Sequence, residues 1–217
     1  MIKATGIEKS YNDEKVLKNV SLTINDGEFV SIMGESGSGK STLISILGGF
    51  LTPDNGVVEW DGEDVFKLSE DRTALLRHTK MGFVFQSFKL IGTLTALDNI
   101  LLPLTLGKAI NEKTKEYVYS LITELGLEKI INKYPNELSG GQCQRVAIVR
   151  ALSYKPKTVI LDEPTGALDS VMEEKVMNLL QRVNKEQGVT IIQVTHSQKV
   201  ASYGSRIIHV KDGETVE

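Results

Sequence analysis

The stretch GESGSGKST at residues 34–42 constrains the fold of this chain more than any other part of the sequence. It follows FVSIM at residues 29–33, a short, continuously apolar run that is typical of a strand covered on both faces. It precedes a run that predicts a helix over residues 40–47, closed by Gly48 and Gly49. A strand that turns through a glycine loop directly into a helix predicts an α/β fold.

This loop also predicts a ligand. Gly34, Gly39, Lys40 and Ser41 match G-x-x-x-x-G-K-[ST], the pattern of a phosphate-binding loop. Glycines allow consecutive backbone N–H groups to curl around phosphate oxygens, and a helix N-terminus favours anions. Lys40 can reach the β- and γ-phosphates, and the hydroxyl of Ser41 suits Mg²⁺. The predicted nucleotide-binding residues are Gly34, Glu35, Ser36, Gly37, Ser38, Gly39, Lys40, Ser41 and Thr42.

Two adjacent carboxylates follow the apolar run TVIL at residues 158–161. Asp162 ends a predicted strand, at the edge where parallel sheets face their ligands, so it is a candidate ligand for Mg²⁺. Glu163 can orient and deprotonate an attacking water as a general base. With the loop, these residues predict an enzyme that hydrolyses a nucleoside triphosphate. The NK pairs, NKYP and NKEQ, lack the aspartate of N-K-x-D, so we do not expect a guanine-specific enzyme.

Composition limits the class of protein. Hydrophobic residues make up 41% of the 217 residues, enough for a packed core, and the net charge of −3 creates no basic field that would attract nucleic acid. No apolar run approaches the roughly 18 residues of a membrane span, and the N-terminal residues lack the apolar core of a signal peptide. The single cysteine, Cys143, has no internal disulfide partner, which favours the reducing cytosol.

The middle of the chain has a helical pattern, whereas its two ends have strand patterns. Helices are predicted at residues 95–106, 111–126 and 139–152, with Asn111 and Ser139 as N-caps and Gly126 just past a helix end. Strands are predicted from the apolar or alternating runs at 16–24, 29–33, 56–65, 81–86, 158–162, 190–196 and 206–210, and a further helix at about 172–184. We therefore predict one domain over residues 1–217, with an α/β core at 1–86 and 151–217 and a helical subdomain at about 87–150.

The motif LSGGQ at residues 138–142 discriminates among these enzymes. With it, the sequence resembles the ABC ATPase family, the nucleotide-binding domains of ATP-binding-cassette systems, over essentially the whole chain and with the motifs in the family's order. The resemblance implies an α/β P-loop core with a mostly parallel sheet, an antiparallel β subdomain and an inserted α-helical subdomain. It also implies ATP and Mg²⁺ as ligands and ATP hydrolysis as the activity.

The resemblance assigns roles to further residues. Tyr11 matches the aromatic that stacks on adenine, Gln86 matches the glutamine that contacts Mg²⁺ and the water, and His196 matches the switch histidine that acts with Glu163. Without it, Tyr11 would be an ordinary strand-edge tyrosine and His196 a structural histidine. Asp169 in GALD matches the D-loop aspartate. The signature residues, which would bind the ATP held by a second copy in a head-to-tail dimer, are Leu138, Ser139, Gly140, Gly141 and Gln142.

Three positions depart from the usual pattern of the family. Cys143 stands where many relatives have glutamine, and Val149 stands where alanine is common. Both are tolerable on a helix that faces the fold, and we expect no chemical role for Cys143. Gly166 precedes ALD where many members have serine, so we expect a looser D-loop there.

The runs FQSFKLIGTLTALDNILLPL and EPTGALDS resemble one branch of the family. That branch serves lipoprotein release, macrolide and toxin efflux, antimicrobial-peptide resistance and cell-division signalling, and works with a permease that has few transmembrane helices and a large extracytoplasmic domain. The resemblance implies a separate permease of this type, and a cytoplasmic location at the inner face of the membrane. Because the chain stops just after VKDGETVE, we expect the permease to be another polypeptide.

Two alternatives are soluble members of the family. One acts on a protein scaffold, as in iron–sulfur cluster assembly, and stays open from the sequence. The other, a DNA-repair or chromosome-organising ATPase, needs a long coiled-coil insertion or zinc-binding cysteines, and this sequence has neither. The apolar residues after Gln86 also have two interpretations, because Phe88, Leu90, Ile91 and Leu94 can fill the helical core or line a groove for a permease helix.

Overall fold

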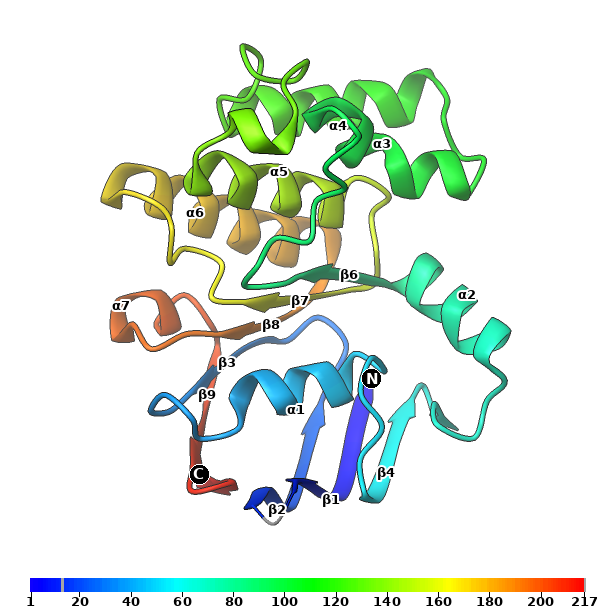
Figure 1. Ribbon diagram of the computed structural model, residues 1–217, viewed down its shortest axis with the longest axis vertical. Coiled ribbons are helices and arrows are strands. Elements are labelled where there is room, and N and C mark those ends of the chain that lie inside the picture. Colours follow the sequence, from blue (N-terminus) through cyan, green and yellow to red (C-terminus); the bar gives the residue numbers. More distant parts are fainter. Residues whose placement is uncertain (13, 217) are drawn as a thin grey trace.

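The computed structural model describes residues 1–12 and 14–216 (Figure 1). Its centre is a six-stranded sheet in the order β10-β9-β3-β8-β7-β6. These strands are β3 (Phe29–Met33), β6 (Met81–Val84), β7 (Thr158–Asp162), β8 (Thr190–Val194), β9 (Arg206–Lys211) and β10 (Glu214–Val216). All neighbours pair in parallel except β9 and β10, which are antiparallel. The predicted mostly parallel sheet is therefore confirmed.

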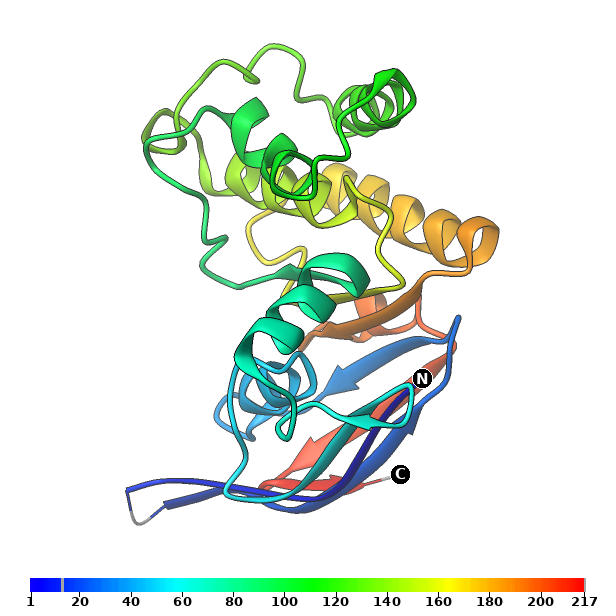
Figure 2. The ribbon, with the colours of Figure 1, turned by 90° about the vertical axis from the view of Figure 1, so that its right-hand side faces the viewer.

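A second, four-stranded sheet is antiparallel and has the order β2-β1-β4-β5. Its strands are β1 (Ile2–Tyr11), β2 (Glu14–Ile24), β4 (Asn55–Trp60) and β5 (Glu63–Asp64). The strand–turn–strand prediction for residues 56–65 corresponds to β4 and β5. Figure 2 shows this sheet at one end of the molecule and the helices α3 to α6 at the other, with the six-stranded sheet between them.

The helices form layers on the two faces of the central sheet. They are α1 (Lys40–Leu47), α2 (Glu70–Lys80), α3 (Ala96–Leu106), α4 (Glu112–Glu124), α5 (Gly140–Leu152), α6 (Ser170–Gln187) and α7 (Gln198–Ala201), with a 3₁₀ turn at Pro135–Glu137. Helix α1 packs between the two sheets, α5 and α6 cover the opposite face of the central sheet, and α3 and α4 lie beyond α5 (Figure 1).

Two apolar clusters explain these layers. Strands β3, β7 and β8 are buried at every position, as their continuous apolar runs predict. Neighbouring side chains of a strand point to opposite faces, so Phe29 joins the cluster under α5 and α6 while Val30 and Ile32 join the cluster around α1. The first cluster continues through α5 to α3 and α4. Because one apolar cluster runs from the sheet into these helices, it does not separate residues 87–150 from the core, and the helical subdomain with these bounds stays a prediction.

The local signals place most helix ends correctly. The helix predicted at residues 40–47 has those bounds. Asn111 and Ser139 accept hydrogen bonds from Thr114 N–H and Gln142 N–H as N-caps, and Gly126 adopts a left-handed φ of 63° after α4. Within residues 1–12 and 14–216, no helix is both long and apolar enough to span a bilayer.

Other elements differ from the sequence predictions. Strand β6 ends at Val84, so Gln86 lies in the following loop, and β8 ends at Val194, so His196 also lies beyond its strand. Helix α2 has no counterpart among the predicted elements, because only Thr73 and Leu76 are buried along it and its apolar periodicity is weak. Strand β1 was likewise not identified as an element.

Candidate active site

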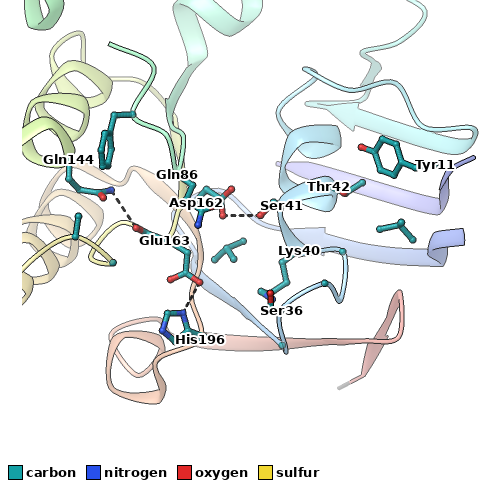
Figure 3. Close-up of a pocket in the computed structure, with 18 residues that line it drawn as sticks. Tyr11, Ser36, Lys40, Ser41, Thr42, Gln86, Gln144, Asp162, Glu163 and His196 are labelled. Atoms are coloured by element: carbon teal, nitrogen blue, oxygen red, sulfur yellow. Dashed lines mark hydrogen bonds and ion pairs between the residues drawn. The ribbon is translucent and has the colours of Figure 1, made fainter. Parts of the chain in front are cut away.

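A cavity of about 690 Å³ lies at the carboxyl ends of four parallel strands, β3, β6, β7 and β8 (Figure 3). Ligands of open α/β sheets bind at this edge. The lining residues are Tyr11, Val16, Gly34, Ser36, Gly37, Gly39, Lys40, Ser41, Thr42, Gln86, Phe88, Gln144, Asp162, Glu163, Gly166, Ala167, Val194 and His196. The cavity therefore joins the glycine loop, Gln86, the acidic pair and His196, which are distant in sequence.

The glycine loop is shaped by close backbone packing. A Cβ atom on Gly34 would lie 2.1 Å from the carbonyl oxygen of Val210, and Gly39 has a φ of 98° at the N-cap of α1. The first N–H groups of α1 lack intrahelical acceptors and lie at the cavity, as an anion cradle requires. Glu35 and Ser38 instead line a neighbouring hollow on the side of the loop that faces β9 and β10.

Lys40 is buried although it is charged, with 8% of its surface exposed. Its Nζ donates to the carbonyl oxygen of Glu35 at 2.5 Å and approaches Ser38 Oγ at 3.4 Å. The ammonium group is therefore folded back over the loop and held at the cavity wall. A lysine held in this way keeps a positive charge beside the loop, within reach of a phosphate group.

Ser41 and Asp162 form an oxygen-rich corner of the cavity. The hydroxyl of Ser41 donates to Asp162 Oδ1 at 3.2 Å (Figure 3). Burial raises the pKa of Asp162, and the neighbouring Glu163 raises it further, whereas the hydrogen bond from Ser41 acts in the opposite direction. Adjacent hydroxyl and carboxylate oxygens fit Mg²⁺, which prefers hard oxygen ligands and few protein groups. Gln86 is exposed and lines the same cavity.

Glu163 is held from several sides. Its φ of 50° is unusual for glutamate, and its N–H donates to the carbonyl oxygen of Val194 at 3.1 Å. Its Oε1 lies 3.0 Å from His196 Nδ1, although the side chain of His196 is 76% exposed and that of Glu163 only 18%. The strained backbone and the histidine therefore aim the carboxylate into the cavity.

Tyr11 lies at the rim of the cavity. Its side chain is 48% exposed, as a platform for a stacked base requires. Figure 3 shows Tyr11 and Thr42 on one side of the cavity and Glu163 and His196 on the other.

The signature residues lie elsewhere. A second hollow of about 320 Å³ is lined by Ser139, Gly140, Gly141, Arg145, Ala167, Leu168, Asp169 and Met172. Among the described residues, Ala167 alone lines both this hollow and the first cavity. Leu138 packs against the apolar cluster, and Gln142 Oε1 accepts from the N–H of Ser139. Asp169 caps α6 by accepting from the N–H groups of Val171 and Met172.

Four cavity residues were not singled out from the sequence, namely Gln144, Val16, Ala167 and Val194. Gln144 is 2% exposed, and its Nε2 donates to the carbonyl oxygen of Glu163 at 3.4 Å. The only sign of Gln144 in the sequence is that it is a polar residue on an otherwise apolar face of α5. Val16, Ala167 and Val194 are common apolar residues, and nothing in the sequence marks them as cavity residues.

Comparisons with known proteins agree with these motifs. The model of the family described as ABC transporter matches residues 17–166. The bacitracin export ATP-binding protein BceA of Halalkalibacterium halodurans is 43% identical over 218 residues, which cover 99% of this chain and 86% of that protein. The macrolide export ATP-binding/permease protein MacB of Syntrophobacter fumaroxidans is 44% identical, and 98% of this chain matches 31% of that protein.

A solved structure gives the same result. The dimeric structure of a post-hydrolysis state of the ATP-binding cassette MJ0796 bound to ADP and Pi has a TM-score of 0.94 and 45% identity, covering 100% of this chain and 97% of that one. The protein MJ0796 is from Methanocaldococcus jannaschii. The family model covers well over half of this chain, and these relatives match nearly all of it. The chain therefore belongs to the ABC transporter family and has the fold of an ATP-binding cassette.

Proposed function

We propose that the cavity bounded by Lys40, Asp162 and Glu163 binds ATP with Mg²⁺ and hydrolyses the ATP. As a member of its family, the chain is the ATP-binding and ATP-hydrolysing subunit of an ABC transporter. One observation supports the residue assignment above all others. The glycine loop, the buried aspartate and the Glu163–His196 pair come from separate parts of the chain and line one cavity.

Binding starts from the glycine loop. The N–H groups of the loop and of α1 surround the phosphates, Lys40 Nζ moves from its backbone acceptor to the β- and γ-phosphates, and Tyr11 stacks on adenine. Bound Mg²⁺ would be held by Ser41, Asp162 and Gln86 and would neutralise charge on the phosphates. The 3.2 Å contact between Ser41 and Asp162 places two of these oxygen ligands side by side.

Hydrolysis follows from Glu163 and His196. The carboxylate of Glu163 accepts a proton from the attacking water as the water oxygen bonds to the γ-phosphorus and the bond to ADP breaks. When both ring nitrogens carry a proton, His196 Nδ1 donates to the carboxylate of Glu163 at 3.0 Å and fixes it, and His196 Nε2 donates to the γ-phosphate. The buried Lys40 stabilises the same charge from the opposite side.

The signature hollow supports a dimer. Ser139, Gly140 and Gly141 present the start of helix α5, but they do not line the first cavity among the described residues. They can contact a γ-phosphate only if that phosphate is held by another chain. We therefore propose that two copies close head-to-tail around two ATP molecules, each cavity facing the other copy's hollow.

A cluster of three aromatic rings, of which Phe50 is exposed and Phe83 and Phe85 are partly buried, supports a permease partner. Phe83 and Phe85 have ring centroids 4.2 Å apart, Phe50 lies 4.9 Å from Phe83, and the Phe50 side chain is 46% exposed. Phe85 directly precedes Gln86, and Ile91 is 41% exposed just beyond it. Exposed apolar patches mark interaction sites. The proposed occupant is a cytoplasmic helix of a separate permease with a large extracytoplasmic domain, which would hold the chain at the inner face of the membrane.

The residues after Gln86 were expected either to fill the helical core or to line a groove for a permease helix, and each interpretation fits some of them. Phe88 and Leu90 pack partly against the apolar cluster, whereas Ile91 is exposed. Co-purification tests the proposed partner. Recovery of the chain with an integral-membrane protein supports the permease, and recovery with soluble proteins alone contradicts it.

Replacement of the general base tests the proposed activity. Glu163→Gln keeps the size of the side chain but cannot accept the proton, so the hydrolysis rate should fall about a hundredfold or more. The ATP-bound dimer should then persist on a sizing column, and wild-type activity should rise more than linearly with protein concentration. Glu174→Gln, at an exposed position of α6, is the control and should keep full activity. A monomeric and fully active Glu163→Gln protein contradicts both proposals.

A further inference from the structure

The segment that follows Gln86 has an unusual backbone. Phe88 and Lys89 are consecutive non-glycine residues with left-handed φ angles of 59° and 49°. Such a pair persists only where surrounding contacts hold it in place. Gln86 and Ser87, by contrast, are exposed between strand β6 and this pair. The contacts that hold Phe88 and Lys89 therefore determine which part of the molecule a displacement of Gln86 would reach.

Arg150 supplies these contacts from the signature helix. Its Nη2 donates to the carbonyl oxygen of Phe88 at 2.7 Å, and its Nη1 donates to that of Lys89 at 2.8 Å. Burial lowers the pKa of Arg150, so its position carries an energetic cost that these charge-assisted hydrogen bonds offset. Arg150 lies in the last turn of α5, and the first turn of α5 carries the signature glycines.

Asn99 fixes the rest of the segment. It is fully buried, its Oδ1 accepts from Ile91 N–H at 2.8 Å, and its Nδ2 donates to the carbonyl oxygens of Ile91, Leu94 and Thr95 at 3.0 to 3.1 Å. Asn99 belongs to α3, which packs on α5 within one apolar cluster. The segment at residues 88–95 is thus attached at two places to the same layer of helices.

We propose that Arg150 is a positioning residue that couples Gln86 in one ATP cavity to the signature at the start of α5. When ATP binds, Gln86 is drawn to the metal and water beside the γ-phosphate, which shifts the exposed residues 86–87, and Arg150 passes this shift through the carbonyls of Phe88 and Lys89 to α5. Because α5 carries Gly140 and Gly141, the shift changes the position of the signature relative to the ATP held by the second copy. This inference rests on the proposed function of Gln86 and the signature.

The chemistry of arginine makes the coupling testable. A planar guanidinium can donate to two neighbouring carbonyls at once, whereas the ammonium group of lysine is a point charge without this fork. Arg150→Ala and Arg150→Lys should therefore lower kcat alike, by about two- to thirtyfold, the range seen for residues that transmit coupling. The affinity for ATP should stay within about twofold of wild type, because Arg150 does not line the cavity.

The decisive experiment combines two measurements on the full chain. First, Arg150→Ala is placed in the Glu163→Gln background, and ATP-dependent dimerisation is followed on a sizing column. Second, hydrogen exchange is measured with and without ATP and Mg²⁺ at residues 86–95 and 140–152. In the wild type, both segments should change protection, and in Arg150→Ala only the first should change. Arg182→Ala, which removes a contact with Glu124 between α6 and α4, is the matched control and should keep both changes.

The outcomes separate this inference from the proposed function. If Glu163→Gln alone stays monomeric with ATP, the proposed dimer is wrong, and hydrogen exchange alone then decides the inference. If segment 140–152 does not respond to ATP in the wild type, or still responds in Arg150→Ala, the coupling is refuted. If Arg150→Ala unfolds, Arg150→Lys replaces it in both measurements, because lysine keeps the charge and packing but not the fork. Wild-type kcat and dimerisation in a folded Arg150→Lys protein also refute the inference.

Discussion

The ATP cavity and the signature hollow are lined by different kinds of residues. The cavity holds charged groups that other parts of the chain restrain, with Lys40 and Asp162 buried and Glu163 fixed by His196. The hollow is lined mainly by small residues and helix starts, with Gly140 and Gly141 opening α5 and Asp169 capping α6. Groups that can move a proton are therefore gathered in the cavity, and the hollow offers surface and N–H groups for docking.

This difference explains why one chain carries two sites that do not face each other. The cavity has the groups for chemistry but is open, whereas in the hollow the carboxylate of Asp169 caps α6 and the guanidinium of Arg145 donates to backbone carbonyls. Ala167 borders both, and a Cβ atom on Gly141 would lie 2.7 Å from the Ala167 carbonyl oxygen. The loop from Glu163 to Asp169 thus connects the two sites directly within each chain.

Mixing two inactive variants gives the sharpest test of this division. Lys40→Ala disables the cavity, and Gly140→Asp places a negative charge in the hollow, where a Cβ atom would only touch that of Ala167 at 3.7 Å. Each variant alone should lose about a hundredfold in hydrolysis rate, the effect of removing one stabilising donor. In an equal mixture, half of the dimers contain both variants, and one of their two sites is intact, so activity should recover to about a quarter of wild type.

The control for this mixture is each variant combined with itself at the same total concentration. An activity of the mixture no greater than the sum of its parts would place the cavity and the signature of one chain in the same site. The comparison between a catalytic cavity and a docking hollow would then be wrong.

Tyr11 tests whether the cavity alone holds the nucleotide. Because an aromatic ring stacks on any base, Tyr11→Ala should weaken the binding of ATP and GTP alike, by about 1–3 kcal/mol. Tyr11→Trp should be nearly neutral and is the matched control. Both affinities are measurable by titration calorimetry at protein concentrations that keep the chain monomeric. Unchanged affinity in Tyr11→Ala would return Tyr11 to the role of an exposed strand-edge residue.

The sequence predicts contiguous features of this molecule well and contacts between distant segments poorly. The glycine loop, helix α1 and the buried strands each lie within a few consecutive residues whose spacing reflects their structure. Arg150 and Phe88 are 62 residues apart, so the hydrogen bond between them leaves no local pattern. Helix α2 was missed because it buries only Thr73 and Leu76, and Gln144 because its partner is a backbone carbonyl in another segment.

The last comparison concerns one carboxylate from each site, Asp162 in the cavity and Asp169 in the hollow, and their effects on stability. Burial raises the pKa of Asp162 above its ordinary value of 3.8, so the folded chain binds this proton more tightly than the unfolded chain. Proton binding by Asp162 therefore adds to the free energy of unfolding. This contribution is fully present below the pKa of the unfolded chain, and it is lost as the pH rises through the raised pKa of the folded chain. At neutral pH the charge of Asp162 therefore destabilises the fold.

Asp162→Asn should therefore raise the melting temperature at about pH 7.5, while hydrolysis is lost, since asparagine keeps the oxygen that accepts from Ser41 but carries no charge. The gain should shrink as the pH is lowered toward the ordinary pKa of the carboxyl group. Asp169→Ala is the contrasting variant, because it removes the cap of α6 and should destabilise the fold by about 0.5–2 kcal/mol. Thermal unfolding of both variants across this pH range provides the measurement. A lower melting temperature for Asp162→Asn at neutral pH would mean that the ionised carboxylate stabilises the empty cavity, and that burial is not the dominant influence on it.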